Sequence, residues 1–498
     1  MPRPLRLLMV SSEVETFART GGLGDVVLGV SRALGARGVD VAIVTPLYGT
    51  TRIPSDDVHR WYGTVPARVG WGADDVRYPG VVEVRLAPNV RVFLVDDPGL
   101  FLRDGIYEDA FGTFGDNELR FATMSRAALS IAERLWGGTG PDRGPDVIHA
   151  HDWHATFALL YARLTMGQAW ADVPTVFTIH NLAYQGVLGF DSLDRLALPR
   201  GAYHPGCLEH GGLVNLLKGA MSVADRVTTV SPTYAREILQ PSGGFQLHHF
   251  LRSLSYKTAG ILNGIDIQSF DPSRDGAIAA NYHADDFAPG RARCKEALVH
   301  ELGLGDPNAP LFSLVSRLTH QKGIDLLLPI VGNLLEGGAR IALVGTGERA
   351  LERALHALGA RYPGRVAARV AFDEKLARRI YAGTDFLLVP SRYEPCGLTQ
   401  MYAMRYGAIP IVTDVGGLHD TVTPFSAVRE EGTGFVAKNP DPLSLLIACD
   451  DALTAYSDRE GFRRLIARAM HRDFSWTRSA DEYLERIYRP ITQLRAGL

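Results

Sequence analysis

Residues 5–44 read LRLLMVSSEVETFARTGGLGDVVLGVSRALGARGVDVAIV, and the order of patterns in this stretch predicts the fold. Residues 5–10 form a short, nearly continuous apolar run, which is typical of a strand buried in a parallel sheet. A glycine-rich turn follows at residues 20–25, and residues 26–34 then space their apolar side chains at helical intervals. Residues 39–44 repeat the strand pattern. The stretch therefore predicts a βαβ unit.

The same alternation recurs along the whole chain. Strand-like runs lie at residues 92–95, 147–150, 176–179 and 227–230, with helical patterns such as residues 118–133 between them. After a looser region at residues 240–257, runs follow at residues 311–315, 341–344, 366–372, 386–389 and 409–412. A single hydrophobic core stops growing near roughly 250–300 residues. The 498 residues therefore predict an α/β protein of two doubly wound domains, with an amphipathic helix at residues 475–498.

Composition excludes several classes of function. Hydrophobic residues make up 46% and charged residues 21%, which is ordinary for a globular protein. The net charge of −3 offers no basic field for nucleic acid or an anionic membrane, and no apolar run is long enough to span a bilayer. The start of the chain lacks the pattern of a signal peptide. Cysteines stand alone, without pairing motifs, so we expect a cytoplasmic protein with Cys207, Cys294, Cys396 and Cys449 reduced.

Two cations follow the predicted strand at residues 311–315. Arg317 and Lys322 stand five residues apart at a strand end, where doubly wound sheets bind ligands, and a diphosphate needs such cations. A solvated basic loop is the alternative interpretation. Lys322 is one of only six lysines in a chain whose other basic residues are arginines, which favours a function for it.

Residues 391–400, SRYEPCGLTQ, follow the predicted strand at residues 386–389. Pro395 suits the first turn of a helix, so we expect Pro395 to lie in that turn and residues 396–399 to start the helix. The unpaired N–H groups of a helix start favour anions, and a sugar diphosphate would fit there with Glu394 accepting hydrogen bonds from hydroxyls. A carboxylate that only caps its helix explains the pattern equally well. Cys396 has no base beside it and is interpreted as a packing residue.

Three polar segments in the first half also follow strands. The turn at residues 20–24, TGGLG, lacks GxGxxG spacing, which disfavours a nicotinamide site but leaves close approach to a phosphate or sugar. Residues 149–154, HAHDWH, suggest a metal site, yet alternation along a strand need not bring the imidazoles together. A sugar pocket formed by Asp152 and Trp153 is the favoured interpretation. His180 and Asn181 follow the next strand and are candidates for ligand contact.

In this order and spacing, the segments resemble the family of bacterial glycogen synthases and plant starch synthases. The matching stretches are residues 12–13 (SE), 20–26 (TGGLGDV), 151–154 (HDWH), 180–186 (HNLAYQG), 229–235 (TVSPTYA), 262–266 (LNGID), 316–318 (SRL), 321–323 (QKG), 345–347 (GTG), 391–400 and 473–476 (DFSW). The resemblance implies a GT-B fold, two Rossmann-like domains facing a deep cleft. It also implies transfer of glucose, with retention, from ADP-glucose to the non-reducing 4-OH of an α-1,4-glucan such as glycogen, with no metal and no cofactor.

The resemblance further implies a division of the chain and a set of site residues. Residues 1–257 would be the acceptor-side (starch synthase catalytic) domain, residues 258–474 the nucleotide-sugar domain, and residues 475–498 a helix returning to the first. Arg317 and Lys322 would hold the diphosphate, with Glu394 near the donor. Asp152, His180 and Asn181 would surround the glucosyl unit. Further substrate contacts would come from Arg19, Gly21, Gly22, Asp25, Tyr107, His154, Asn263, Gly345, Cys396, Gly397, Leu398 and Thr399.

Departures from the family pattern leave some questions open. Arg19 stands where the family usually has lysine, and a planar guanidinium does not simply replace an ammonium, so UDP-glucose remains an alternative donor. The loop at residues 245–249, FQLHH, lacks the usual glycine and acidic residues. Front-side displacement is favoured over double displacement, but the sequence does not choose between them. Two alternative functions remain: a related transferase that uses another acceptor, and a non-catalytic protein that binds glucan.

Overall fold

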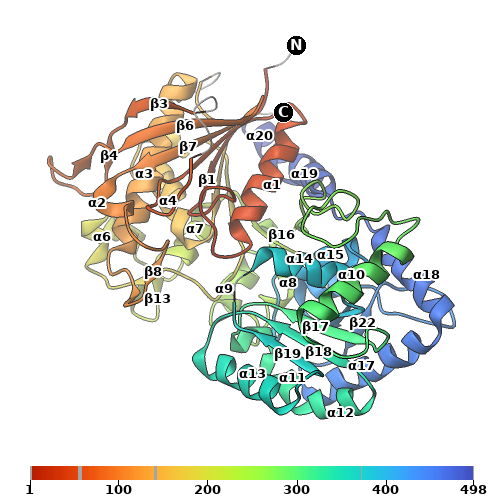
Figure 1. The fold of residues 1–498 in the computed structure, drawn as a ribbon. Coiled ribbons are helices and arrows are strands. Elements are labelled where there is room, and N and C mark those ends of the chain that lie inside the picture. The colour runs from red at the N-terminus through yellow and green to blue at the C-terminus, as the bar shows by residue number, and fades with distance from the viewer. Residues whose placement is uncertain (1–2, 54–58, 140–142, 372, 497–498) are drawn as a thin grey trace. The chain divides into compact units, whose positions relative to one another are not determined.

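The computed structural model describes residues 3–53, 59–139, 143–371 and 373–496, and the chain forms two compact units (Figure 1). Unit 1 comprises Met1–Val230, Ala235–Gly264 and Trp476–Leu498. Unit 2 comprises Ser231–Tyr234 and Ile265–Ser475. The chain therefore passes from one unit to the other at four places, and one of the inserted pieces, Ser231–Tyr234, is only a few residues long.

Unit 1 is built on a nine-stranded sheet. Its order is β16 (Thr258–Gly260), β15 (Arg226–Thr229), β11 (Thr175–Ile179), β10 (Val147–His151), β1 (Arg6–Val10), β2 (Asp40–Pro46), β7 (Val90–Asp96), β6 (Gly80–Ala87) and β3 (His59–Thr64). Neighbours from β16 to β7 pair in parallel, whereas β6 is antiparallel to both β7 and β3. The strands predicted from the apolar runs are confirmed. The antiparallel edge was missed because its strands alternate apolar and polar residues and lie partly exposed.

Strand β1 lies at a switch point of this sheet. The chain runs from β1 through helix α1 (Leu23–Gly35) to β2 on one side, and it later returns to β10 on the other side of β1. Open α/β sheets bind ligands at such a point, beyond the carboxyl ends of the strands. The residues that follow β1, β10 and β11 are therefore placed at one edge of the sheet.

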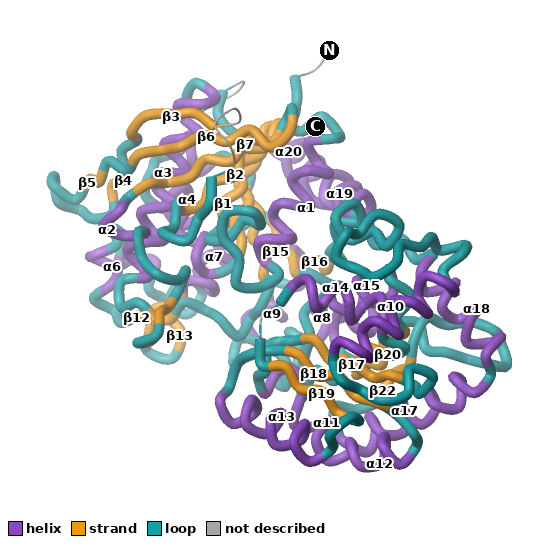
Figure 2. Tube along the Cα trace, in the orientation of Figure 1, coloured by secondary structure: helices purple, strands orange, loops and turns teal. Residues whose placement is uncertain are grey.

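Helices pack around the unit 1 sheet, purple around orange in Figure 2. Besides α1, they are α2 (Pro98–Phe101), α3 (Asn117–Trp136), α4 (Thr156–Leu164), α5 (Gln168–Ala171), α6 (Ser192–Arg195), α7 (Leu216–Val223) and α9 (His248–Ser253). Three small antiparallel ribbons lie in its loops: β4 (Ala67–Arg68) with β5 (Val76–Arg77), β8 (Glu108–Asp109) with β9 (Gly112–Thr113), and β14 (Leu213–Asn215) between β12 (Val187–Leu188) and β13 (Glu209–His210).

The C-terminal helix belongs to unit 1. It consists of α19 (Trp476–Glu482), a π-helical turn (Tyr483–Tyr488) and α20 (Arg489–Ala496), and residues 497–498 of the predicted helix lie outside the described residues. The Trp476 ring lies directly over Gly29 of α1, where a Cβ atom would come within 2.0 Å of the indole nitrogen. The Tyr488 hydroxyl hydrogen bonds to Nδ1 of His149 on β10 at 2.8 Å. The helix thus joins the core beneath α1.

Unit 2 contains a six-stranded, fully parallel sheet. Its order is β19 (Val366–Arg369), β18 (Arg340–Val344), β17 (Leu311–Val315), β20 (Phe386–Val389), β21 (Ile409–Thr413) and β22 (Phe435–Ala437). The five predicted strands are confirmed, although the run at residues 366–372 ends early at Arg369, and Phe372 lies outside the described residues. Strand β22 was missed because only three residues form it.

The helices of unit 2 complete the doubly wound architecture. They are α10 (Ala288–Glu301), α11 (Ile324–Leu327), α12 (Val331–Glu336), α13 (Arg349–Arg361), α14 (Glu374–Gly383), α15 (Thr399–Arg405), α16 (Gly416–Thr421), α17 (Pro442–Ser457) and α18 (Arg459–Met470). A further short helix, α8 (Pro232–Glu237), begins in the inserted piece of unit 2 and ends in unit 1.

The contact between Trp476 and Gly29 predicts a large effect of truncation. Trp476 is buried in the main core cluster of unit 1, so Trp476→Ala should lower the free energy of unfolding by about 3–5 kcal/mol. Urea unfolding followed by circular dichroism measures this change. Trp71→Ala is the matched control, because that tryptophan is 57% exposed, and it should change stability by less than about 0.5 kcal/mol. Equal losses in the two variants would contradict the packing role.

Candidate functional site

A buried carboxylate organises the edge of the unit 1 sheet after β1. Glu13 is 3% exposed and accepts hydrogen bonds from the Thr20 backbone N–H and hydroxyl, both at 2.7 Å, and from the Gly21 N–H at 3.2 Å. The Tyr107 hydroxyl also donates to it, at 2.6 Å. Glu13 therefore fixes the glycine-rich turn and Tyr107 together. Sequence reasoning gave it no role, although a polar pair directly after a buried strand was the available signal.

The glycine-rich turn leads into α1, with Gly22 at the N-cap position. A Cβ atom on Gly24 would lie 2.8 Å from the Glu15 backbone nitrogen, so packing requires glycine there. The space next to Gly21 is open, since a Cβ would meet nothing within 4 Å. The Arg19 guanidinium lies 3.2 Å from the Asp25 carboxylate in the first turn of α1. The turn thus presents an open backbone flanked by an ion pair.

Asp152 connects the ends of β10 and β11. Its backbone has φ 56°, a left-handed conformation that side chains other than glycine rarely adopt. Its carboxylate accepts hydrogen bonds from the backbone N–H groups of His180 at 2.8 Å and Asn181 at 3.4 Å. Burial raises the pKa of Asp152 to about 7, although these two N–H groups oppose the shift. Strained backbone held by buried hydrogen bonds is common at functional sites.

The imidazoles near β10 do not converge on one point. His149 bonds to Tyr488 and to the Thr178 hydroxyl, His151 bonds to His180 with 3.0 Å between Nδ1 and Nε2, and the ring of His154 instead stacks on Tyr107 with centroids 4.4 Å apart. Burial lowers the pKa of His149, His154 and His180 to about 3, so these rings are neutral. Within the described ranges, no group of His, Cys, Asp and Glu is arranged to hold a metal ion.

The remaining candidates of unit 1 lie around this edge. The Asn181 side-chain oxygen accepts a hydrogen bond from the Ala183 N–H and so shapes the loop after β11. Asn263 is buried in the segment that follows β16. The Trp153 ring covers Gly186, where a Cβ atom would lie 2.5 Å from it, and it meets the Phe121 ring edge-on. Trp153 is therefore held mainly by protein contacts.

In unit 2, an ion pair joins the loops after β17 and β20. The Lys322 ammonium lies 2.5 Å from the Glu394 carboxylate, which also accepts a hydrogen bond from the Ser391 hydroxyl at 2.8 Å. Glu394 is 5% exposed, whereas Arg317, in the same loop as Lys322, is exposed. The two segments predicted to act together are thus brought together, and a buried carboxylate holds the lysine in place.

Close backbone contacts hold these strand-end loops against one another. A Cβ atom on Gly345 would lie 1.9 Å from the Ser316 carbonyl oxygen, and one on Gly417 would lie 2.1 Å from that of Cys396. The Ser231 hydroxyl donates to the Pro395 carbonyl at 2.6 Å, so the inserted piece of unit 2 supports the same loop. Cys396 itself is buried and packs, as expected. No sequence signal marked the Ser231 contact, because it joins segments far apart in the chain.

The predicted helix start needs a correction. Helix α15 begins at Thr399 with Leu398 as its N-cap, so Pro395 and Cys396 precede the helix. The reason is Gly397, whose φ of +72° is incompatible with a right-handed helix. The segment at residues 395–398 is therefore a loop that ends in a helix start. Glycine is required at position 397.

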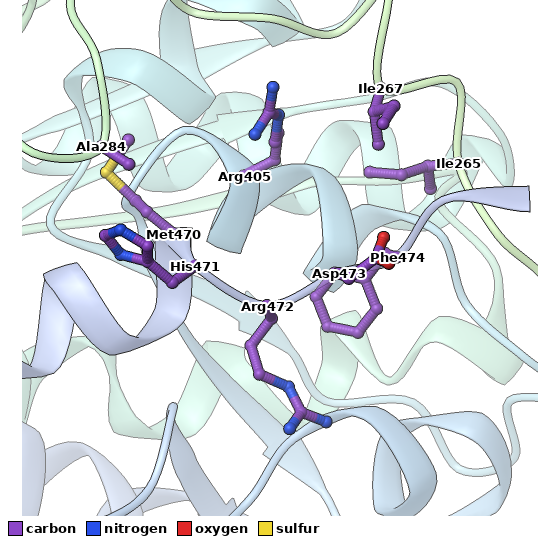
Figure 3. Close-up of a pocket in the computed structure, with 9 residues that line it drawn as sticks. All are labelled: Ile265, Ile267, Ala284, Arg405, Met470, His471, Arg472, Asp473 and Phe474. Carbon is purple, nitrogen blue, oxygen red and sulfur yellow. The ribbon is translucent and has the colours of Figure 1, made fainter. Parts of the chain in front are cut away.

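A separate cavity of about 260 Å³ lies elsewhere in unit 2 (Figure 3). It is lined largely by apolar side chains, among them Ile265, Met470 and Phe474, where the chain enters and leaves this unit. The Ile265 N–H donates to the Phe474 carbonyl at 2.7 Å beside it. The cavity is thus distinct from the strand-end loops that contain Lys322 and Glu394.

Known proteins are similar to this chain over nearly its whole length. Residues 6–253 match the family described as starch synthase catalytic domain, and residues 309–470 match glycosyl transferases group 1. A glycogen synthase of Anaeromyxobacter sp. (strain Fw109-5) is 42% identical over 98% of this chain and 99% of that protein. Glycogen synthase 2 of Agrobacterium fabrum is 41% identical over 96% of this chain and 92% of that protein.

A solved structure extends the comparison to the fold. The catalytic domain of starch synthase IV from Arabidopsis thaliana, bound to ADP and acarbose, superposes with a TM-score of 0.88 at 32% identity. The match covers 98% of this chain and all of that one. The predicted fold class, GT-B with two doubly wound units, is therefore confirmed. Within the described part of the chain, no helix is long and apolar enough to cross a membrane.

The raised pKa of Asp152 predicts a pH-dependent stability. The folded chain keeps a proton on this carboxyl up to about pH 7, whereas the unfolded chain releases it near the ordinary value of 3.8. The free energy of unfolding should therefore fall as pH rises from about 4 to about 7. Asp152→Asn removes this titration, so its stability should fall less steeply than that of the native chain over the same range.

Urea unfolding at a series of pH values tests this prediction. Asp451→Asn, which changes an exposed carboxylate on α17, is the control and should follow the native pH profile. Parallel profiles for the native chain and Asp152→Asn would show that the buried carboxyl does not titrate in this range.

Proposed function

Because this chain belongs to the family of bacterial glycogen synthases and plant starch synthases, we propose that it transfers glucose from ADP-glucose to the non-reducing 4-OH of an α-1,4-glucan. The observation that carries this proposal is identity of about 40% over nearly the full length of several glycogen synthases. The chain is a glycosyltransferase with the GT-B fold. We propose unit 1 as the acceptor-side domain and unit 2 as the nucleotide-sugar domain.

In unit 2, Arg317 and Lys322 would bind the diphosphate of the donor. Positive charge on the leaving phosphate stabilises the negative charge that grows as the glycosidic bond breaks. The pair of Lys322 with Glu394 supports this role, because the carboxylate holds the ammonium at a fixed position beside the loop 395–398. The backbone of Gly397, Leu398 and Thr399, at the start of α15, would offer N–H groups to the phosphates. Gly345 and Cys396 would shape the loops that bind the diphosphate.

In unit 1, Asp152, His180 and Asn181 would surround the glucosyl unit. A neutral imidazole binds a sugar hydroxyl without adding positive charge beside the oxocarbenium-like transition state. Tyr107 and the backbone at Gly21 and Gly22, both organised by Glu13, would contribute further contacts. His154 would act by supporting the Tyr107 ring. Arg19, Asp25 and Asn263 would make further contacts with the substrate in unit 1.

We propose retention by front-side displacement. Double displacement needs a carboxylate that is free to attack the anomeric carbon. The Asp152 carboxyl is engaged by two backbone N–H groups, and its raised pKa favours the neutral form, which is a poor nucleophile. Glu13 is engaged by Thr20, Gly21 and Tyr107. The acceptor hydroxyl would therefore attack from the side of the leaving phosphate, which takes its proton.

Transfer of radiolabelled glucose to glycogen tests the activity and the donor. We expect label to be incorporated from ADP-glucose in preference to UDP-glucose, and α-amylase should release it. Incorporation from UDP-glucose alone would replace the proposed donor and would give Arg19 a part in nucleotide choice. Incorporation from neither donor would overturn the proposed function.

Replacement of Lys322 tests the proposed diphosphate-binding role of unit 2. Lys322→Ala should lower kcat by about 10²–10³-fold, because a group that stabilises transition-state charge is lost. The matched control is Lys375→Ala on α14, where the lysine is exposed, and it should keep native kinetics. Initial rates at saturating glycogen measure the effect. A loss below about three-fold in Lys322→Ala would exclude a role for this ammonium in the chemical step.

A further inference from the structure

Behind His180, unit 1 buries a second imidazole to which the proposed mechanism gives no task. His151 ends strand β10, is 1% exposed, and its Nδ1 lies 3.0 Å from Nε2 of His180. The other nitrogen of His151, Nε2, is buried and meets no hydrogen-bond partner in the described part of the chain. One proton therefore lies between Nδ1 of His151 and Nε2 of His180. The nitrogen that carries this proton determines the tautomer of both rings.

Only two arrangements satisfy this contact with neutral rings. If His180 donated from Nε2, His151 would carry its own proton on Nε2, where a buried N–H would lack an acceptor. If His151 donates from Nδ1, its buried Nε2 holds only a lone pair, and His180 carries its proton on Nδ1. Buried N–H groups without partners are rarer in proteins than unsatisfied acceptors. The second arrangement is therefore favoured.

We propose that His151 is a positioning residue that holds His180 in the Nδ1–H tautomer, so that His180 presents a hydrogen-bond donor to the substrate. The inference rests on the proposed function for the identity of that substrate, a sugar bound as donor. Which nitrogen of a histidine carries the proton is set by the hydrogen bond that the other nitrogen makes. His180 is partly exposed, and the proposal requires its Nδ1 to meet the ligand.

The surroundings of His151 restrict its ring. The His149 ring lies beside it, with centroids 4.1 Å apart, and both nitrogens of His149 are hydrogen-bonded, one to Tyr488 and one to Thr178. Thr178 in turn contacts the Thr228 hydroxyl at 2.6 Å. Turning the His151 ring over would place a carbon against Nε2 of His180 and lose the bond. The C-terminal helix thus supports, through Tyr488 and His149, the ring that orients His180.

The first experiment reads the tautomers directly. The full-length chain is labelled with ¹⁵N-histidine, and long-range ¹⁵N–¹H correlation spectra show which nitrogen of each ring carries the proton. Loss of signals in His180→Ala and His151→Asn assigns the two residues. We expect protons on Nδ1 of both. A proton on Nε2 of His180 overturns the proposal, and because this measurement uses no substrate, its outcome is separate from that of the proposed function.

The second experiment tests the consequence for catalysis. His151→Asn places an amide N–H near the position of Nδ1 and should keep kcat within about three-fold of native, whereas His151→Leu lacks a donor and should lower kcat about 10–100-fold. His300→Leu, at an exposed position on α10, is the control and should match the native chain. Equal losses in His151→Asn and His151→Leu would mean that His151 acts by packing alone, which also overturns the proposal. If the native chain shows no transfer at all, the proposed function fails and the spectra alone decide the tautomer.

Discussion

In a parallel sheet with helices on both faces, the central strands are largely apolar, so most of the polar groups that can meet a ligand lie at or just after the ends of the strands. Both units obey this constraint. Glu13, Asp152 and His180 follow β1, β10 and β11 in unit 1, while Arg317 and Glu394 follow β17 and β20 in unit 2. The parallel direction of the strands then brings these residues to one edge of each sheet. The candidate site depends on this arrangement before any specific contact is made.

The two edges are made rigid by different means. In unit 2, glycines allow backbone to pack on backbone, as at Gly345 against Ser316 and Gly417 against Cys396, and one ion pair orients Lys322. Any side chain at these glycines would force the loops apart. In unit 1, buried polar groups hold the loops, with Glu13 bonded to the glycine-rich turn and Asp152 bonded to the start of the next loop. In the proposed function, Arg317 and Lys322 of unit 2 would bind the diphosphate, and the neutral imidazole of His180 in unit 1 would bind the sugar.

Neutrality in unit 1 follows from burial. An imidazole or a carboxyl removed from water loses the hydration that stabilises its charged form, which is why the pKa of His180 falls to about 3 and that of Asp152 rises to about 7. His180 then acts as a neutral hydrogen-bonding partner, and Asp152 keeps its proton up to about pH 7. Their protons are placed by neighbours such as His151 and Tyr488, the latter contributed by the far C-terminal end of the chain.

Most of the fold and much of the candidate site could be read from local pattern. Apolar runs predicted the parallel strands except the three-residue β16 and β22, and polar motifs directly after the predicted strands gave Lys322, Glu394, Asp152 and His180, because strand period and strand ends are local properties of the chain. The antiparallel edge of unit 1 could not be predicted from local pattern, because its strands are partly exposed. The late start of α15 could not be predicted either, because it depends on the positive φ of Gly397.

Contacts between segments far apart in the chain could not be predicted from the sequence. The bond between Ser231 and Pro395, the packing of Trp476 on Gly29 and the pairing of His151 with His180 join residues whose proximity is set by how the strands and helices pack. The protonation of Asp152 and His180 is also a property of the folded state, because burial exists only there. The chain's residue types and their order specify which chemistry is available. Packing specifies which of those groups meet and what charge they carry.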